Sequence, residues 1–234
     1  MITLNRRTAN RLRWFLDNWL PPIVREGWPF TRMVKSWLGS QSLPDFKERA
    51  FGMTDAQFAA AYRNISGAYT ERQTDTTENQ ASWVRENIPP GRKILEIGPG
   101  RGMLTDRLIA SGQNVICLDL DLFGGGPACP SVVGVAERLP FRDKSVDITI
   151  VCHVVEHVRS LTLTFMELER ITRDRVLIVT PRQRSYKVTF DYHLQFFYSI
   201  GHLASHVHKG TAYGTEVDGD LCLIWNIPRK ELRP

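Results

Sequence analysis

The chain has 234 residues, of which 42% are hydrophobic and 24% are charged, and its formal net charge is +5. These values are ordinary for a globular protein, and the length suits one large domain or a core domain with an appendage. No run of eighteen apolar residues, no secretory signal pattern and no C-x-x-C pair occurs, so we expect no transmembrane helix, reduced thiols and a cytoplasmic protein.

The excess of positive charge lies in residues 1–40, which hold seven basic residues, two acidic residues and four tryptophans. Basic residues interleaved with tryptophan indicate either peripheral membrane contact or an anionic-ligand surface. The alternative, which we favour, is a helical appendage whose aromatic face packs on the main domain. No nucleic-acid-binding module is recognisable, so no nucleic acid is expected as a partner.

The first third of the chain is predicted to be helical, with breaks at proline and glycine. The expected helices are residues 5–20, about 30–38, a segment from Asp55, and one from Thr77 or Glu78 to Asn87. Pro89, Pro90 and Gly91 then end this part. We therefore divide the chain into a helical N-terminal cap, residues 1–88, and a second domain, residues 89–234.

The second domain alternates short apolar runs with helical segments. The expected strands are 93–97, 114–118, 131–135, 146–152, 175–180 and 221–227, and the expected helices are Met103–Ala110, about 160–172 and about 193–204. Continuous apolar runs are typical of strands that are buried on both faces. The order predicts an α/β fold with a doubly wound, mostly parallel, Rossmann-like sheet, whose ligand site lies beyond the carboxyl ends of the strands.

A glycine-rich turn joins the first strand of this sheet to a helix, in the segment Ile94–Thr105 (ILEIGPGRGMLT). Gly98, Gly100 and Gly102 follow one another at alternate positions. Such a turn lets a flat ligand lie against bare backbone, and the helix N-terminus favours an accepting group. A dinucleotide fingerprint needs its third glycine at Met103, so the pattern argues against that class. A strand–turn–helix without a ligand remains the alternative.

The second strand ends in Asp119, and Asp121 follows two places later. A carboxylate at that point can accept hydrogen bonds from both hydroxyls of a ribose. A helix N-cap is the alternative for either residue, and we favour the ribose role for Asp119.

A longer block, residues 134–158 (GVAERLPFRDKSVDITIVCHVVEHV), carries a specific resemblance. Together with the glycine turn, Glu96, the ELERI segment at 167–171 and the VLIVTP strand, it resembles the ubiquinone/menaquinone-biosynthesis-like (type 11) family of class I S-adenosylmethionine-dependent methyltransferases. The resemblance spans about 90–198 and does not extend over 1–88. The matching residues of the block are Leu139, Pro140, Phe141, Asp143, Ser145, Asp147, Glu156 and His157.

The resemblance implies S-adenosyl-L-methionine as the cofactor and methyl transfer to a small-molecule or lipid- or glycan-linked acceptor. It also implies a part for nine cofactor-binding residues. Glu96, Gly98, Pro99 and Gly100 would line the methionine end and the ribose side, Asp119 and Leu120 the ribose and adenine, and Ala136 and Glu137 the adenine. Cys152 or His153 would lie near the sulfonium.

Two features depart from the family. Val135 stands where the family has an aspartate that accepts from the adenine amino group, so that contact must come from the backbone, Glu137 or water. Residues 122–131 (LFGGGPACPS) replace a helix, because three glycines and two prolines cannot form one. These departures favour a more open adenine pocket. They also motivate the alternative of a degenerate, non-catalytic binding or partner protein. A nicotinamide oxidoreductase ranks third.

Histidines supply the candidates for the acceptor side, because a neutral imidazole takes a proton near pH 7. His153 ends the fourth strand and His193 follows the fifth, and we predict these two as catalytic. His157 is expected to make a structural hydrogen bond. His202, His206 and His208 lie close in sequence but have no second ligand cluster, so no metal is assigned.

Overall fold

A computed structural model describes residues 19, 21–30, 32–33, 43–69, 74–120, 129–185 and 192–228. The predicted helix at 5–20, apart from residue 19, lies outside the described residues. Asp121 and most of the 122–131 segment lie outside them as well. Residues 28–30 and 32–33, within or next to the predicted second helix, are helical.

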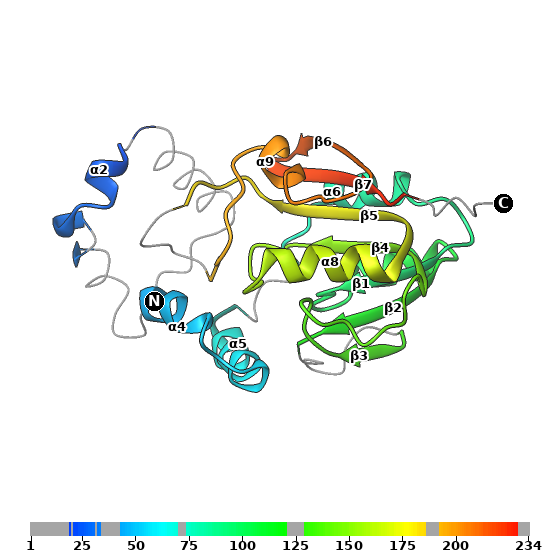
Figure 1. Ribbon diagram of the computed structural model, residues 1–234, viewed down its shortest axis with the longest axis horizontal. Coiled ribbons are helices and arrows are strands. Elements are labelled where there is room, and N and C mark those ends of the chain that lie inside the picture. Colours follow the sequence, from blue (N-terminus) through cyan, green and yellow to red (C-terminus); the bar gives the residue numbers. More distant parts are fainter. Residues whose placement is uncertain are drawn as a thin grey trace.

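In the described part of the chain, a seven-stranded sheet has the order β3-β2-β1-β4-β5-β7-β6 (Figure 1). Its strands are β1 (Lys93–Ile97), β2 (Asn114–Asp119), β3 (Ser131–Val133), β4 (Val146–Cys152), β5 (Thr172–Pro181), β6 (Thr211–Val217) and β7 (Asp220–Asn226). The first five run parallel, and β7 pairs antiparallel with both β5 and β6. The doubly wound, mostly parallel prediction is confirmed.

The sheet differs from the prediction in one strand. β6 was not predicted, because most of its side chains are exposed at the sheet edge and its sequence carries no apolar run. The chain leaves β1 toward β2 and β3 on one side and returns to β4 and β5 on the other. In folds of this kind, the crevice at that reversal is where a ligand binds.

Helices cover both faces of the sheet. They are α6 (Glu78–Glu86), α7 (Met103–Ala110), α8 (Leu161–Ile171) and α9 (Ile200–Ala204), preceded along the chain by α2 (Pro22–Arg25), α4 (Leu43–Ala50) and α5 (Asp55–Tyr69). Leu95 faces the cluster that α8 and α9 complete, whereas Ile94 faces the one that α6 and α7 complete. Among these helices as far as they are described, none is long and apolar enough for a membrane crossing.

The predicted helix at 193–204 was too long, since α9 begins only at Ile200. The residues before it bond to other segments instead. Leu194 and Gln195 donate their backbone N–H groups to the carbonyl of Glu156, and Gln183 donates to the carbonyl of Phe197. This segment is therefore held across the ends of β4 and β5.

α6 lies before the predicted boundary at residue 88, and it packs on the sheet. Thr77 and Gln80 form a capping box at its N-terminus, as that pattern predicts. Ala81 and Val84 are buried against β1 and α7. The division of the chain at residue 88 stays a prediction.

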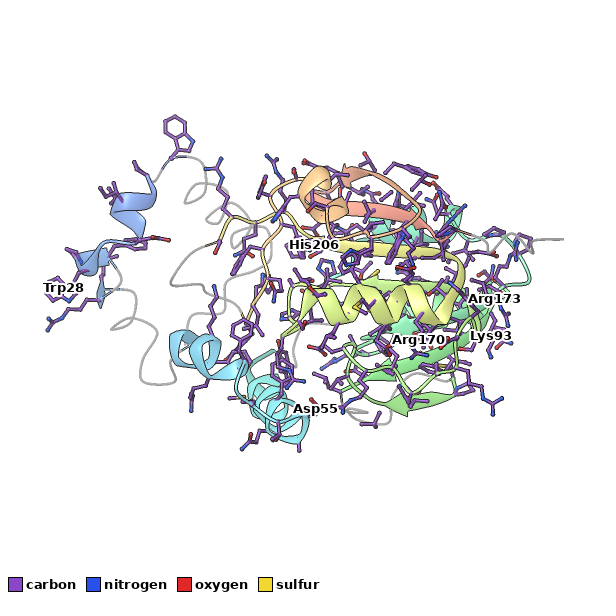
Figure 2. The ribbon with its side chains drawn as sticks, viewed as in Figure 1. Trp28, Asp55, Lys93, Arg170, Arg173 and His206 are labelled. Carbon is purple, nitrogen blue, oxygen red and sulfur yellow. The ribbon has the colours of Figure 1, made fainter. Side chains whose placement is uncertain are left out.

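Residues in the middle of the block at 134–158 have a structural role. Arg170, labelled in Figure 2, extends from α8 and donates to the carbonyls of Leu139 and Phe141. Its guanidinium also pairs with Asp143 at 2.9 Å and Glu167 at 2.7 Å. This network fixes the turn that leads into the amino end of β4, opposite the predicted ligand edge.

Candidate active site

The glycine turn has a backbone that only glycine adopts readily. Gly98, Gly100 and Gly102 have φ values of +69°, +55° and +79°. A Cβ on Gly98 would lie 2.3 Å from Cγ2 of Val154, whereas a Cβ on Gly100 would meet nothing within 4 Å. The turn therefore packs against the β4 edge on one side and offers a bare surface on the other. That cradle fits a flat nucleoside ligand, and Pro99 lies within it.

Glu96 lies beneath this turn and is buried. Thr105, on α7, donates its hydroxyl to Oε2 of Glu96 at 2.5 Å. Burial raises the pKa of this carboxyl to about 7. Glu96 therefore ties β1 to α7 below the cradle, and its predicted contact with the cofactor stays a prediction.

Asp119 and the segment after β3 lie beside the turn. The N–H of Gly98 donates to the carbonyl of Leu118 at 2.8 Å, and that of Gly134 donates to the carbonyl of Asp119 at 2.9 Å. Oδ1 of Asp119 accepts from the N–H of Leu120 at 2.7 Å. The structure thus brings Asp119, the carboxylate predicted to bind the ribose, next to the cradle, because β1 and β2 are parallel neighbours.

An open pocket of about 360 Å³ lies beyond Asp119, between the sheet and α5. It is lined by Leu120, Val133, Gly134, Val135, Arg138, Pro140 and, from α5, by Asp55, Ala56 and Ala59. Ala136, next to Val135 in the chain, is buried and is not part of this lining. Glu137 turns to Arg159, from whose backbone N–H it accepts at 2.8 Å. The predicted adenine edge is therefore apolar at Val135, with the Glu137 carboxylate already engaged.

Ion pairs join α5 to the sheet at this pocket. Asp55, labelled in Figure 2, pairs with Arg138 and with Arg159, the latter at 2.5 Å. Arg159 also donates to the carbonyl of Met53 at 2.7 Å. The hydrogen bond from Arg159 lowers the pKa of the Asp55 carboxyl, despite the opposing effect of burial. No local sequence pattern predicts these pairs, because they join residues 83 and 104 positions apart.

The end of β4 places Cys152 and His153 beside the glycine turn. Cys152 is buried, which raises its thiol pKa well above the ordinary value and keeps the thiol neutral. His153 has a φ of +55°, a conformation that side chains rarely adopt. Its Nδ1 lies 3.6 Å from Glu156 Oε1 and its Nε2 lies 3.7 Å from Asp220 Oδ2. Burial lowers the pKa of His153, but the two carboxylates outweigh it and raise the pKa overall.

His193 lies on the neighbouring segment after β5. Its Nδ1 is 2.6 Å from Oε1 of the buried Gln183. Its ring packs edge-on against His157, with the ring centroids 4.8 Å apart. The two predicted histidines, His153 and His193, thus both lie close to Glu156.

An aromatic cluster closes this side of the site. Phe46 on α4 packs edge-on against Tyr192, and Tyr62 on α5 contacts the same ring in a tilted arrangement. The Tyr62 hydroxyl lies 2.8 Å from Nδ1 of His157, so the structural hydrogen bond expected of His157 involves α5. Figure 1 shows α4 and α5 together at one end of the sheet.

The predicted site residues therefore gather along one edge of the sheet, at the carboxyl ends of β1, β2, β4 and β5. Sequence reasoning missed three polar or aromatic neighbours, namely Gln183, Asp220 and Tyr62. Gln183 carried one signal, because a polar side chain directly after a buried strand lies at this edge. Asp220 belongs to the β6–β7 hairpin, of which one strand was not predicted.

The residues that form this edge are similar in sequence to known methyltransferases. Residues 95–180 match the family model described as a methyltransferase domain. The chain is 32% identical over 130 residues to a demethylmenaquinone methyltransferase of Mycobacterium sp. (strain JLS), covering 48% of this chain and 55% of that protein. It is 30% identical over 123 residues to an uncharacterized methyltransferase of Mycobacterium tuberculosis, covering 48% of each. The chain thus spans only about half the length of these relatives.

Solved structures share the fold. A protein of Pyrococcus horikoshii OT3 superposes with a TM-score of 0.54 at 14% identity, over 64% of this chain and 89% of that one. A chain of the complex between the Trm112 methyltransferase activator and a methyltransferase of Haloferax volcanii gives a TM-score of 0.54 at 14% identity, over 76% and 97%. At these identities the likeness supports the Rossmann-like fold alone.

Proposed function

We propose that this chain, whose residues 95–180 match a methyltransferase domain, is a class I S-adenosylmethionine-dependent methyltransferase that transfers a methyl group to a small-molecule or lipid- or glycan-linked acceptor. One observation carries the proposal: the glycine turn, on which Gly100 offers a bare face, is bonded through Gly98 to the carbonyl of Leu118, the residue before Asp119, at the reversal point of the sheet. A ligand that uses both the bare glycine backbone and the Asp119 carboxylate has a flat polar surface and a diol.

The residues of this edge have separate parts in holding the cofactor. The turn from Gly98 to Gly100 lets the ligand approach the backbone, and Asp119 accepts from the ribose hydroxyls. The pocket at Leu120 and Val135 takes the adenine ring through apolar contact. When bound, S-adenosylmethionine supplies a methyl group on a positively charged sulfur, which transfers to a nucleophile without further activation of the cofactor.

The acceptor side lies at His153 and His193, because they follow β4 and β5 at the carboxyl edge, where β4 is next to β1 and β5 is next to β4. The chain's part there is to align the acceptor with the methyl group and to exclude water, which supplies a large share of the acceleration in such reactions. The aromatic cluster of α4 and α5 provides an apolar wall for that purpose. We propose that residues 1–88 cap the acceptor side, on the support of this packing.

Calorimetry with S-adenosylhomocysteine tests the cofactor site. Replacing Asp119 with Asn keeps the shape and removes the charge, so the dissociation constant is expected to rise roughly 10- to 100-fold, the worth of a charged hydrogen bond. Asp143→Asn, at the opposite end of the sheet, is the matched control. Equal affinity in the two variants, or no binding to the unaltered chain at millimolar concentration, would overturn the assignment.

A degenerate, non-catalytic relative is the second candidate function. Val135 favours it, because a buried valine lines the adenine pocket where the family has an accepting carboxylate. Cofactor binding without transfer to any member of a broad acceptor panel would support this candidate. Transfer to a single acceptor would remove it.

The basic residues 1–40 support a further proposal, that this region contacts anionic membranes. Sedimentation with anionic liposomes compares the full chain with a chain that begins at Thr74. Pelleting of the full chain alone is expected. Equal, negligible pelleting of both would contradict membrane contact.

A further inference from the structure

A group of three metal-binding side chains lies at the acceptor edge, next to the proposed cofactor cradle. Glu156 and His157 follow β4, and His193 follows β5. Each offers one ligand atom, and these atoms all lie within 4.8 Å of one another, a grouping that the described residues form at this place alone. We propose that this Glu–His–His cluster binds a divalent first-row transition metal ion.

The Glu156 carboxylate gives the strongest support. The side chain is buried, and Oε2 accepts from the Thr180 hydroxyl at 3.0 Å. Oε1 is also buried and makes no hydrogen bond, although Nδ1 of His153 lies 3.6 Å from it. A buried carboxylate oxygen without a hydrogen bond is costly, and coordination of a cation reduces that cost.

The spacing between Oε1 and His157 is that of two ligands on one ion rather than that of a hydrogen bond. Oε1 lies 4.0 Å from Nε2 of His157. Bonds of about 2.0–2.2 Å to a shared ion let ligand atoms lie up to roughly 4.2 Å apart. The widest separation in the cluster exceeds that limit by less than about 1 Å, which small side-chain rotations cover.

Outer hydrogen bonds orient both imidazoles for coordination through Nε2. Nδ1 of His193 bonds to the amide oxygen of Gln183 at 2.6 Å. Nδ1 of His157 lies 3.3 Å from the carbonyl of Tyr192 and 2.8 Å from the Tyr62 hydroxyl. An oxygen acceptor at Nδ1 keeps the proton there and leaves the lone pair on Nε2, which is how metal-binding histidines are held.

The ligand set also indicates the class of metal and of acceptor. Two imidazoles favour transition metals over magnesium or calcium, which prefer oxygen ligands. Three protein ligands leave coordination positions open. This second step rests on the proposed function: an open position beside His153 and the cradle suits a hydroxyl oxygen of the acceptor. The inferred acceptor class is therefore an alcohol or phenol.

Titration of the full chain, without a histidine tag, with Co²⁺ tests the site. We expect one equivalent to bind and to give visible d–d absorption from nitrogen and oxygen ligands. Glu156→Gln and His193→Ala are expected to weaken binding at least tenfold. His208→Ala removes an exposed histidine outside the cluster and is expected to leave binding unchanged.

Gln183→Ala is the second variant, which keeps all three ligands. Loss of such an outer partner lowers metal affinity about 10- to 100-fold in comparable sites. Absence of saturable Co²⁺ binding to the full chain, or equal affinity in His193→Ala and His208→Ala, would overturn the proposal. Circular dichroism of each variant identifies loss of fold, and Gln183→Ala decides the matter if Glu156→Gln does not fold.

Calorimetry with S-adenosylhomocysteine on the same samples separates this inference from the proposed function. Cofactor binding without Co²⁺ binding overturns the metal site alone. Co²⁺ binding without cofactor binding overturns the proposed function and leaves the metal site standing. Methyl transfer to an alcohol acceptor that chelation abolishes would support the inferred acceptor class, and transfer that chelation leaves unchanged would contradict it.

Discussion

The hydroxyl of Tyr62 lies 2.8 Å from Nδ1 of His157, although 95 positions separate the two residues in the chain. The contact joins α5 to the turn that follows β4. Asp55, seven residues before Tyr62, joins the same helix to Arg159, which follows His157 by two residues, and to Arg138, which follows β3. α5 is therefore attached both to the segment after β4 and to the segment after β3.

Removing the Tyr62 hydroxyl tests this attachment. Tyr62→Phe is expected to lower the free energy of unfolding by about 0.5–1.5 kcal/mol, the usual worth of one hydrogen bond. Urea denaturation provides the measurement. Tyr213→Phe, on the exposed edge strand β6, is the control and is expected to change little. An equal decrease in the free energy of unfolding of the two variants would show that the Tyr62–His157 contact does not stabilise the protein.

Two glycines of the turn are expected to respond differently to alanine. Gly98→Ala combines a positive φ with a Cβ that would lie 2.3 Å from Val154, so it should destabilise the free protein by more than about 2 kcal/mol. Gly100→Ala faces open space and should cost only the backbone strain, about 1–2 kcal/mol. Thermal denaturation separates the two effects. The prediction fails if Gly100→Ala is the less stable variant.

Gly100→Ala has a second expected effect. A methyl group on the open face of the cradle enters the space proposed for the cofactor, so affinity for S-adenosylhomocysteine should fall even though the protein folds. Calorimetry measures this. Gly112→Ala, which also has a positive φ and open surroundings but follows α7, is the matched control. The same affinity in both alanine variants would place the ligand elsewhere.

The buried Glu96 carboxyl makes stability depend on pH. Its pKa is raised to about 7 from 4.5, so the folded protein holds a proton that the unfolded chain releases between these values. The free energy of unfolding therefore falls as the pH rises from about 4.5 to 7, by on the order of 3 kcal/mol. The Glu96→Gln variant has no carboxyl at this position, so its free energy of unfolding does not show this fall. Its stability relative to the unaltered protein should rise by that amount between pH 4.5 and pH 8, as measured by urea denaturation. A difference that is the same at both pH values would contradict the expectation.

The ion pairs of Asp55 should affect both stability and cofactor affinity. Asp55→Asn removes the charge that Arg159 and Arg138 share, and Asp55 is partly exposed, so the expected loss of stability is only about 1 kcal/mol. Affinity for S-adenosylhomocysteine should fall several-fold, because α5 walls the pocket. Asp143→Asn breaks an ion pair at the other end of the sheet and serves as the control. An unchanged affinity in Asp55→Asn would show that α5 does not contribute to the binding site.

Local patterns predicted the parts of the fold that depend on neighbouring residues. The helix at Met103–Ala110 was predicted with its observed bounds, because a glycine turn precedes it and its apolar positions follow a helical period. β1 and β4 were also predicted with their observed bounds, since buried parallel strands are continuous apolar runs. β6 was missed, because an exposed edge strand carries no such run.

The candidate site was predictable only where the chain order places it. Parallel strands bring Gly98, Asp119 and His153 to one edge, which follows from the predicted topology alone. The approach of His193 to His157 does not follow from it. That approach depends on backbone bonds from Leu194 and Gln195 to the Glu156 carbonyl, across a segment predicted as helix.

The placement of α6 has a practical consequence for dissecting the molecule. Because Ala81 and Val84 fill the same apolar layer as Ile94, a fragment cut at the proline break would carry an uncovered hydrophobic face. Such a fragment should aggregate when expressed. Truncated chains should therefore begin before the Thr77 capping box. A loss of activity can then be attributed to removal of the N-terminal region rather than to the exposed hydrophobic face.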